Sequence, residues 1–269
     1  MESIDCHLHV IDPERFPFAD GPGYRPLAHE RGSHEQLIET LNAHGVRHGL
    51  LVQPGCYGHN NAALLDAIAT SHGKLKGIAA VDVEATEAEL HSLKDRGIIG
   101  IRLNLLDYDK RVLSDPRLKN LLAKVRTLDW WVEVHASGQL LLDALTLCRE
   151  AEVNTLVEHW GRPTVAAGTE QHHFQELLRF GREGRAVVKL SAPYRVSASP
   201  PPYHDLDPFA ESLLAAFSPQ RCIWGSDWPF INTSRPPDYE TVKAAIGRWL
   251  SGDELQQVLW TTPARLFGF

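Results

Sequence analysis

Short apolar segments alternate with amphipathic segments along the whole chain of 269 residues. The apolar segments are rich in Val, Ile and Leu, as in strands buried within a parallel sheet. The amphipathic segments repeat their apolar residues every three to four positions, as in helices packed on a sheet. The expected strands are 4–11, 48–53, 75–81, 98–104, 130–135, 155–159, 186–191 and 221–227. The expected helices are 34–44, 60–71, 87–96, 116–128, 139–151, 171–181, 208–217 and 239–250, followed by two short C-terminal helices.

This alternation predicts a parallel sheet. Eight strand–helix units predict an α/β fold, a (β/α)8 TIM barrel that forms a single domain over residues 1–269. The links from helix to strand are short, whereas several links from strand to helix are long, above all the irregular segment 12–33. Barrel enzymes carry their sites on the second set of links. The alternative is an open doubly wound sheet, but no G-x-G-x-x-G motif follows the first strand.

Composition narrows the class of protein further. A hydrophobic fraction of 43% and a charged fraction of 23% are ordinary for a soluble globular protein. The formal net charge of −7 argues against a nucleic-acid partner and against an anionic membrane surface. The four cysteines are far apart and form no CxxC motif, so we expect free thiols: Cys6, Cys56, Cys148 and Cys222. Because no signal peptide and no long apolar run is found, we expect a cytoplasmic protein without a membrane span.

The first predicted strand contains a His-x-His motif, His7-Leu8-His9. Strand alternation would place Asp5, His7 and His9 on one face, and the residues between them on the other. Two imidazoles at a strand end can bind a divalent metal, or can polarise a carbonyl and orient a water molecule. The alternative is a chance pair, because the chain contains 14 histidines.

Other polar residues end the later strands and would converge on the same mouth of a barrel. Asp227 ends the last strand and can bind metal or act as a general base, unless it only supplies a turn. His159 ends the sixth strand and can polarise a carbonyl, bind a water or bind metal, unless it is a hydrogen-bonded core histidine. Glu133 and His135 share a face at the end of the fifth strand.

Three arginines form a second group near that mouth. Arg102 lies near the end of the fourth strand, on the same face as Asn104, and a buried guanidinium there needs an anionic partner from the protein or a ligand. Arg162 and Arg195 follow the sixth and seventh strands. Planar guanidinium groups suit the recognition of carboxylates, with about 1.5–3 kcal/mol per charged hydrogen bond. The alternative is structural pairing with Asp or Glu on neighbouring loops.

The histidines together with Asp227 resemble the amidohydrolase superfamily. The likeness is closer to one branch, the 2-pyrone-4,6-dicarboxylate lactonase group of the amidohydrolase-2 family. It rests on segments that span nearly the whole chain in the expected order: Phe16-Pro-Phe18 with Tyr24, and segments 52–61, 100–104, 159–163, 189–197 and 224–229. The combination is specific, although each piece alone is weak.

The resemblance implies a hydrolase of aromatic-compound catabolism that opens a carboxylated lactone without a required cofactor. Asp227 would activate the water, while His7, His9 and His159 would polarise the lactone carbonyl. Arg102, Arg162 and Arg195, with Tyr24 and Asn104, would bind the substrate. The lead substrate is 2-pyrone-4,6-dicarboxylate or a close analogue. The protein would be a monomer or a homodimer.

The first departure from the family pattern is a missing arginine. The second arginine that the family carries after the fourth strand has no clear equivalent, because Leu106, Asp107 and Tyr108 fill that stretch. Arg111 could reach the site only if its loop bends. The substrate would therefore carry a different second acid group, or none.

The second departure concerns metal. The fifth strand ends in His135, where the dicarboxylate lactonase has a tyrosine. His7, His9, His135 and Asp227 could then bind one divalent ion such as Zn or Mn, which would lower the pKa of its water to about 7. A metal-free site is favoured, because the fourth strand has no lysine or acid to complete a two-metal centre.

Three functions stay open on the residues alone. The first is hydrolysis of a carboxylated lactone, including a sugar-acid lactone. The second is metal-dependent nonoxidative decarboxylation of an aromatic acid. The third is carboxylate binding without turnover.

Overall fold

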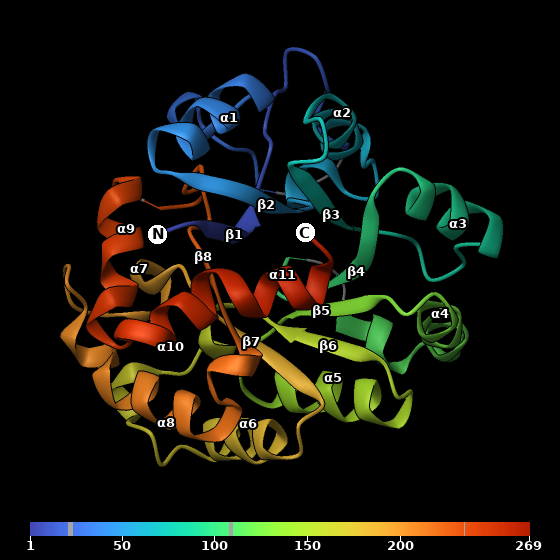
Figure 1. Cartoon of the computed structure of the whole chain (residues 1–269). Helices are drawn as coiled ribbons and strands as arrows, with labels where there is room; N and C mark the ends of the chain where they lie inside the picture. The colour runs from blue at the N-terminus through green and yellow to red at the C-terminus, as the bar shows by residue number, and fades with distance from the viewer. Residues whose placement is uncertain (21–23, 108–109, 234) are drawn as a thin grey trace.

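Eight parallel strands form one sheet in the order β1 to β8 (Figure 1). The computed structural model describes residues 1–20, 24–107, 110–233 and 235–269, so Tyr108 and residues 21–23 of the predicted irregular segment lie outside it. The strands are β1 Ser3–Leu8, β2 Val46–Val52, β3 Leu75–Ala79, β4 Ile98–Asn104, β5 Trp131–His135, β6 Asn154–Val157, β7 Ala186–Ser191 and β8 Cys222–Gly225. The His9 amide donates to the Trp228 carbonyl at 2.9 Å, which brings the first strand against the last. The sheet is therefore a nearly closed barrel, and the predicted (β/α)8 TIM barrel is confirmed.

Helices surround the barrel, as Figure 1 shows. The longer ones alternate with the strands as predicted: α1 His34–Ala43, α2 Ala62–Thr70, α3 Glu87–Asp95, α4 Pro116–Thr127, α5 Gly138–Glu150, α6 His172–Arg182, α8 Asp207–Phe217 and α9 Tyr239–Ala245. The shorter helices are α7 Pro193–Val196, α10 Gly252–Gln256 and α11 Thr262–Phe267. Helix α7 is not among the predicted elements. The expected helix 239–250 is also wrong in length, because α9 ends at Ala245 and a 3-10 turn follows at Ile246–Arg248.

Two apolar cores hold these layers. The smaller core fills the barrel and combines side chains of six strands with Phe267 of α11: Ile4, Cys6, Leu50, Val52, Ile78, Leu156, Val187 and Ile223. The larger core lies between the strands and the helices. Because α11 contributes to the interior core, the strands are packed at that end, and polar residues are left to the opposite end, where the strands finish.

The first strand departs from simple alternation. A register irregularity lies between Asp5 and Leu8. The Asp5 carboxylate accepts hydrogen bonds from the Ser226 amide at 2.9 Å and from the Tyr239 hydroxyl of α9 at 2.7 Å. It therefore faces the helix layer, whereas Cys6 packs in the interior core. The prediction that Asp5 shares a face with His7 and His9 is wrong, because such an irregularity resets the alternation of side chains.

Two predictions from composition can be compared with the structure. All four cysteines are free and buried, as expected. In the part of the chain that the structure describes, no helix is both long enough and apolar enough to span a membrane.

Candidate active site

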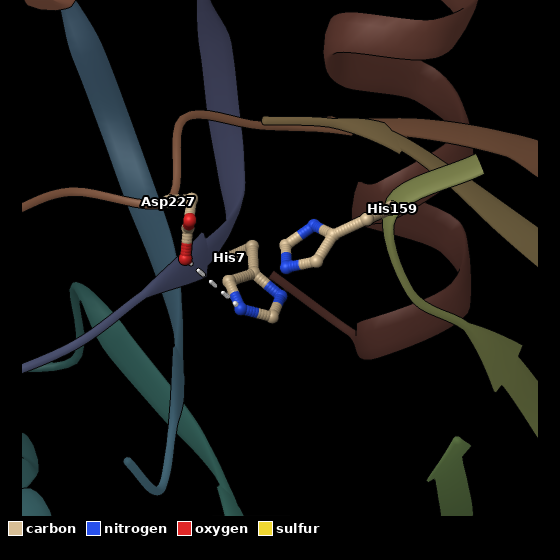
Figure 2. Close-up of side chains that lie close together, drawn as sticks. All are labelled: His7, His159 and Asp227. Atoms are coloured by element: carbon tan, nitrogen blue, oxygen red, sulfur yellow. Dashed lines mark ion pairs between the residues drawn. The ribbon is translucent and has the colours of Figure 1, made fainter. Parts of the chain in front are cut away.

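Three buried side chains from different ends of the chain meet at the mouth of the barrel. They are His7 on β1, His159 just after β6 and Asp227 just after β8, as Figure 2 shows. Each offers a nitrogen or oxygen atom, and these atoms lie within 4.8 Å of one another. His9, one residue past β1, joins them with its Nε2 atom 3.2 Å from Asp227 Oδ1. The structure thus brings together the four residues that the sequence predicts as catalytic.

All three strands that carry these residues end earlier than predicted. The expected strand 4–11 ends at Leu8, the expected strand 155–159 ends at Val157, and the expected strand 221–227 ends at Gly225. His159 and Asp227 therefore lie in turns. In the turn after β6, four consecutive residues have positive φ angles: His159 at 43°, Trp160 at 64°, Gly161 at 71° and Arg162 at 48°. Residues other than glycine rarely adopt this backbone conformation. Such residues are concentrated at functional sites, where surrounding contacts stabilise the conformation.

The turn after β8 depends on a close approach to β1. A Cβ atom added to Gly225 would lie only 2.6 Å from the Cβ atom of His7. Glycine therefore allows the two strands to approach closely beside the site. Two residues later, the Asp227 amide donates to the His7 carbonyl at 2.9 Å, and Asp227 has a φ of 69°.

The Asp227 carboxylate has polar contacts on both of its oxygen atoms. Its Oδ1 atom lies 3.5 Å from His7 Nε2, in addition to the His9 contact. Its Oδ2 atom accepts hydrogen bonds from the Tyr194 hydroxyl at 2.6 Å and from Arg195 Nε. Burial alone would raise the pKa of Asp227, but Arg195 and the hydrogen bond with His9 hold it well below its usual range. Asp227 is therefore ionised at neutral pH.

The two histidines of the motif have different partners. His9 Nδ1 lies 2.7 Å from the Val52 carbonyl, which can only accept, so this nitrogen carries the proton. A neutral His9 then presents the lone pair of Nε2 to Asp227, and only a proton or a cation between them makes that contact favourable. Burial and the charge of Lys189 lower the pKa of His7 well below its ordinary value. His7 is therefore a neutral imidazole.

A buried ion pair lies beneath His7. Lys189 Nζ donates to Glu133 Oε2 at 2.6 Å and to the Cys6 carbonyl at 2.8 Å, and it lies 3.3 Å from His7 Nδ1. Glu133 Oε1 also lies 3.3 Å from that nitrogen. Burial raises the pKa of Glu133, and the charge of Lys189 lowers it. Lys189 is not among the residues predicted from the sequence, although a lysine within a strand of apolar neighbours is a signal that could have found it.

A second buried ion pair ties β4 to the end of β6. Arg102 Nε donates to Glu158 Oε1 at 2.6 Å, and Arg102 Nη2 donates to Glu158 Oε2 at 2.8 Å. His135 Nδ1 lies 2.6 Å from the same Oε2 atom. The anionic partner that Arg102 requires is thus supplied by the protein. Glu158 was missed in the sequence, although it directly precedes His159 at the end of a buried strand.

The side chains around this mouth line a cavity of about 170 Å³. Its lining includes the predicted substrate-binding residues Arg102, Arg162, Arg195 and Tyr24, together with Asp107 and His135. The Tyr24 hydroxyl donates to Glu30 Oε2.

Asn104 does not line this mouth. Its Nδ2 atom donates to Asp107 Oδ2 at 2.7 Å, and it lines a larger neighbouring cavity of about 1010 Å³ together with Arg111. Arg111, whose role the sequence left open, therefore lines the cavity beside the mouth and not the mouth itself.

Comparison with known proteins identifies the family of this chain. A family model described as Amidohydrolase matches residues 4–269. The chain belongs to the amidohydrolase family. It is 32% identical over 270 residues to a 4-sulfomuconolactone hydrolase of Rhizobium radiobacter, covering 98% of this chain and 89% of that protein. It is 31% identical over 277 residues to a 2-pyrone-4,6-dicarboxylate hydrolase of Comamonas testosteroni, covering 98% of this chain and 90% of that protein.

A solved structure is similar to this amidohydrolase over the whole length of both chains. It is a probable 2-pyrone-4,6-dicarboxylic acid hydrolase from Acinetobacter baumannii with citric acid bound, with a TM-score of 0.91 and 31% identity. The resemblance to this branch of the family, stated from the sequence motifs, is confirmed.

The site of this amidohydrolase has atoms that fit a divalent metal ion. His7 Nε2 is buried and has no hydrogen-bond partner among the residues that the structure describes. It lies close to Asp227 and His159, and imidazole and carboxylate groups suit zinc or manganese. His135 falls in a different group, with Glu158 and His159. The fit is therefore to His159, rather than His135, beside His7 and Asp227.

Proposed function

We propose that this amidohydrolase is a lactone hydrolase that opens a carboxylated lactone with water. The observation that carries the proposal is the ionised Asp227 carboxylate, which faces two neutral or proton-sharing imidazoles inside a cavity lined by guanidinium groups. The names of the similar proteins, hydrolases of 4-sulfomuconolactone and of 2-pyrone-4,6-dicarboxylate, support the same reaction class. The lead substrate is 2-pyrone-4,6-dicarboxylate or a close analogue.

The first step is attack of water on the lactone carbonyl carbon. Asp227 accepts the proton of the water, and the new C–O bond gives a tetrahedral oxyanion. We expect imidazole N–H groups of His7 and His159 to stabilise that oxyanion, and His9 to do so only when its Nε2 atom is also protonated, because its Nδ1 proton is held by the Val52 carbonyl. Such preorganised donors are worth about 3–4 kcal/mol each.

The second step breaks the ring C–O bond. Asp227 returns its proton to the departing ring oxygen, so the carboxylate is regenerated. The new acid ionises at neutral pH, so hydrolysis releases one proton for each ring opened. Acid therefore favours the closed lactone.

Asp227 is a weak base because its pKa is low. Brønsted behaviour makes a weak base slow toward a poor electrophile. An activated cyclic ester needs less help than an amide, which supports a lactone as the substrate. When a divalent ion is bound by His7, His9, His159 and Asp227, it would polarise the lactone carbonyl and lower the pKa of a bound water to about 7.

The arginines are proposed to hold and frame the substrate. Arg162 lines the mouth and offers a guanidinium to a substrate carboxylate. Arg195 pairs with Asp227, so it holds the base in place and contributes positive charge near the developing oxyanion.

The test is turnover of a lactone panel by the purified protein. The panel contains 2-pyrone-4,6-dicarboxylate, 2-pyrone-6-carboxylate and D-glucaro-1,4-lactone, and the readouts are ring absorbance for the pyrones and proton release for all three. The proposal expects ring opening of at least one carboxylated lactone with one proton released per ring. Binding without proton release from any of them would contradict the proposal and favour a carboxylate-binding protein.

A further inference from the structure

The charges around the mouth do not all balance within the protein. Three arginines line the cavity, but two of them already have buried carboxylate partners. Arg102 is paired with Glu158, and Arg195 is paired with Asp227. The remaining charged side chains of the lining are Arg162 and Asp107. These two decide which charges a ligand can bring into the mouth.

Arg162 is the remaining cation of the cavity lining. Within residues 1–20, 24–107, 110–233 and 235–269, no carboxylate forms an ion pair with its guanidinium, and its backbone amide donates to the His159 carbonyl at 2.8 Å. Burial and the neighbouring Arg195 lower the pKa of Arg162, whereas the charges of Glu158, Asp227 and Asp107 raise it without forming an ion pair with the guanidinium. A partly buried guanidinium of this kind is stabilised by an anionic ligand.

Asp107 is the anion that is left over, on the segment after β4. Its Oδ2 atom accepts a hydrogen bond from Asn104 Nδ2 at 2.7 Å, and its amide donates to Asn104 Oδ1 at 3.1 Å. Asn104 thus fixes the turn that presents Asp107 to the mouth. Among the described residues, no Lys or Arg forms an ion pair with this carboxylate. Its Oδ1 atom is therefore available to a hydrogen-bond donor of a ligand.

We propose that this mouth selects a lactone with one anionic group, held by Arg162, and with a hydroxyl or similar hydrogen-bond donor, held by Asp107. A second anionic group on the Asp107 side is disfavoured, because it would lie beside a like charge. The inference rests on the proposed function and narrows its substrate class from 2-pyrone-4,6-dicarboxylate to a close analogue with a single anionic group. It assigns Asp107 and Arg162 as the residues that set specificity.

The proposal is tested with ligands that lack a lactone bond, so that binding is measured apart from turnover. The set is benzoate, 3-hydroxybenzoate and benzene-1,3-dicarboxylate, which differ in one ring substituent, and binding is measured by titration calorimetry. The wild-type protein should bind 3-hydroxybenzoate about tenfold more tightly than the dicarboxylate. Equal binding, tighter binding of the dicarboxylate, or no binding of any of the three would overturn the proposal.

Variants assign the preference to its residues. Asp107→Asn should remove the about tenfold preference, whereas Asp107→Glu should retain it in part, because the charge is kept. The matched control is Asp82→Asn, which removes the same charge from the exposed loop after β3 and should leave the preference unchanged. Arg162→Met should weaken binding of all three ligands by about tenfold or more. An unchanged preference in Asp107→Asn would overturn the assignment.

The same ligands separate this inference from the proposed function. If the preference is found but no lactone is opened, the specificity stands and the hydrolase function fails. If lactones are opened but the dicarboxylate is preferred, the hydrolase function stands and the specificity fails.

Discussion

The polar groups on the two sides of the barrel mouth differ in whether they have hydrogen-bond partners within the protein. On the side of β4 and β5, Arg102, Glu158 and His135 satisfy one another through short hydrogen bonds. On the side of β1 and β8, His7 Nε2 is buried without a hydrogen-bond partner in the described part of the chain, and His9 presents its second nitrogen to a carboxylate. The first arrangement needs nothing more from solution, whereas the second is completed by a water, a proton, a cation or a substrate. We therefore expect the first side to maintain the fold and the second side to carry the chemistry.

The largest effect is expected at the base. Asp227→Asn removes the group that accepts the proton from water, so kcat for lactone opening should fall by about 10²–10⁴-fold. The measurement is a progress curve with the best lactone of the panel, with folding checked by circular dichroism. The control is Asp253→Asn, an exposed residue of α10, which should keep the wild-type rate. Wild-type kcat in Asp227→Asn would rule out the assignment of the base.

A substitution on the other side of the mouth, beside β4 and β5, should lower the stability of the protein. Glu158→Gln leaves the Arg102 guanidinium buried without a counter-ion, which should lower the free energy of unfolding by about 3–5 kcal/mol. The measurement is denaturant unfolding of the variant and the wild type at pH 7. A matched comparison is Glu84→Gln, which breaks an exposed ion pair with Arg117 and should cost about 1 kcal/mol or less. A loss as small as that in Glu158→Gln would contradict the structural role of this side.

A smaller effect is expected where substrate is held. Arg162→Met removes one charged hydrogen bond to a substrate carboxylate, worth about 1.5–3 kcal/mol, so KM should rise by about 10- to 150-fold. Initial rates over a range of lactone concentrations separate KM from kcat. A fall in kcat at constant KM would instead place Arg162 with the chemical side of the mouth.

The smallest effect concerns pH. The pKa of Asp227 is held well below its usual range, and burial lowers the pKa values of His7 and His159 well below theirs. The charge states of these groups therefore do not change from pH 8 down to pH 6, and kcat/KM should be flat over that window. As the pH falls further, Asp227 loses its stabilising charge only below its folded pKa, so activity should decline in strong acid. A falling limb centred near pH 6.5 would show that a histidine of the site titrates normally.

The barrel was predictable because its pattern is local. Each buried strand and each amphipathic helix can be recognised within a short window of sequence. The polar residues at the ends of the predicted strands indicated that His159 and Asp227 lie at the same mouth. The irregularity in β1 was not predictable, because nothing in Ile4-Asp5-Cys6-His7 marks where alternation is reset. The result was a wrong face for Asp5.

The ion pairs below and beside the mouth depend on register between strands. Arg102 pairs in register with Glu133 of β5, yet its guanidinium bonds to Glu158 at the end of β6. That choice follows from three-dimensional packing, and the sequence could show only that a buried arginine needs a partner. The same holds for Lys189, whose partner Glu133 lies two strands away around the barrel.

The central claim is that the side chains of this protein, with Asp227 as base, open a carboxylated lactone. The most direct measurement is the rate of ring opening of 2-pyrone-6-carboxylate by wild-type and Asp227→Asn protein, each freed of metal with a strong chelator and then dialysed. The account predicts that the treated wild type keeps its rate within about twofold and that treated Asp227→Asn is slower by about 10²–10⁴-fold. Loss of the wild-type rate on chelation, restored by added zinc or manganese, would contradict it.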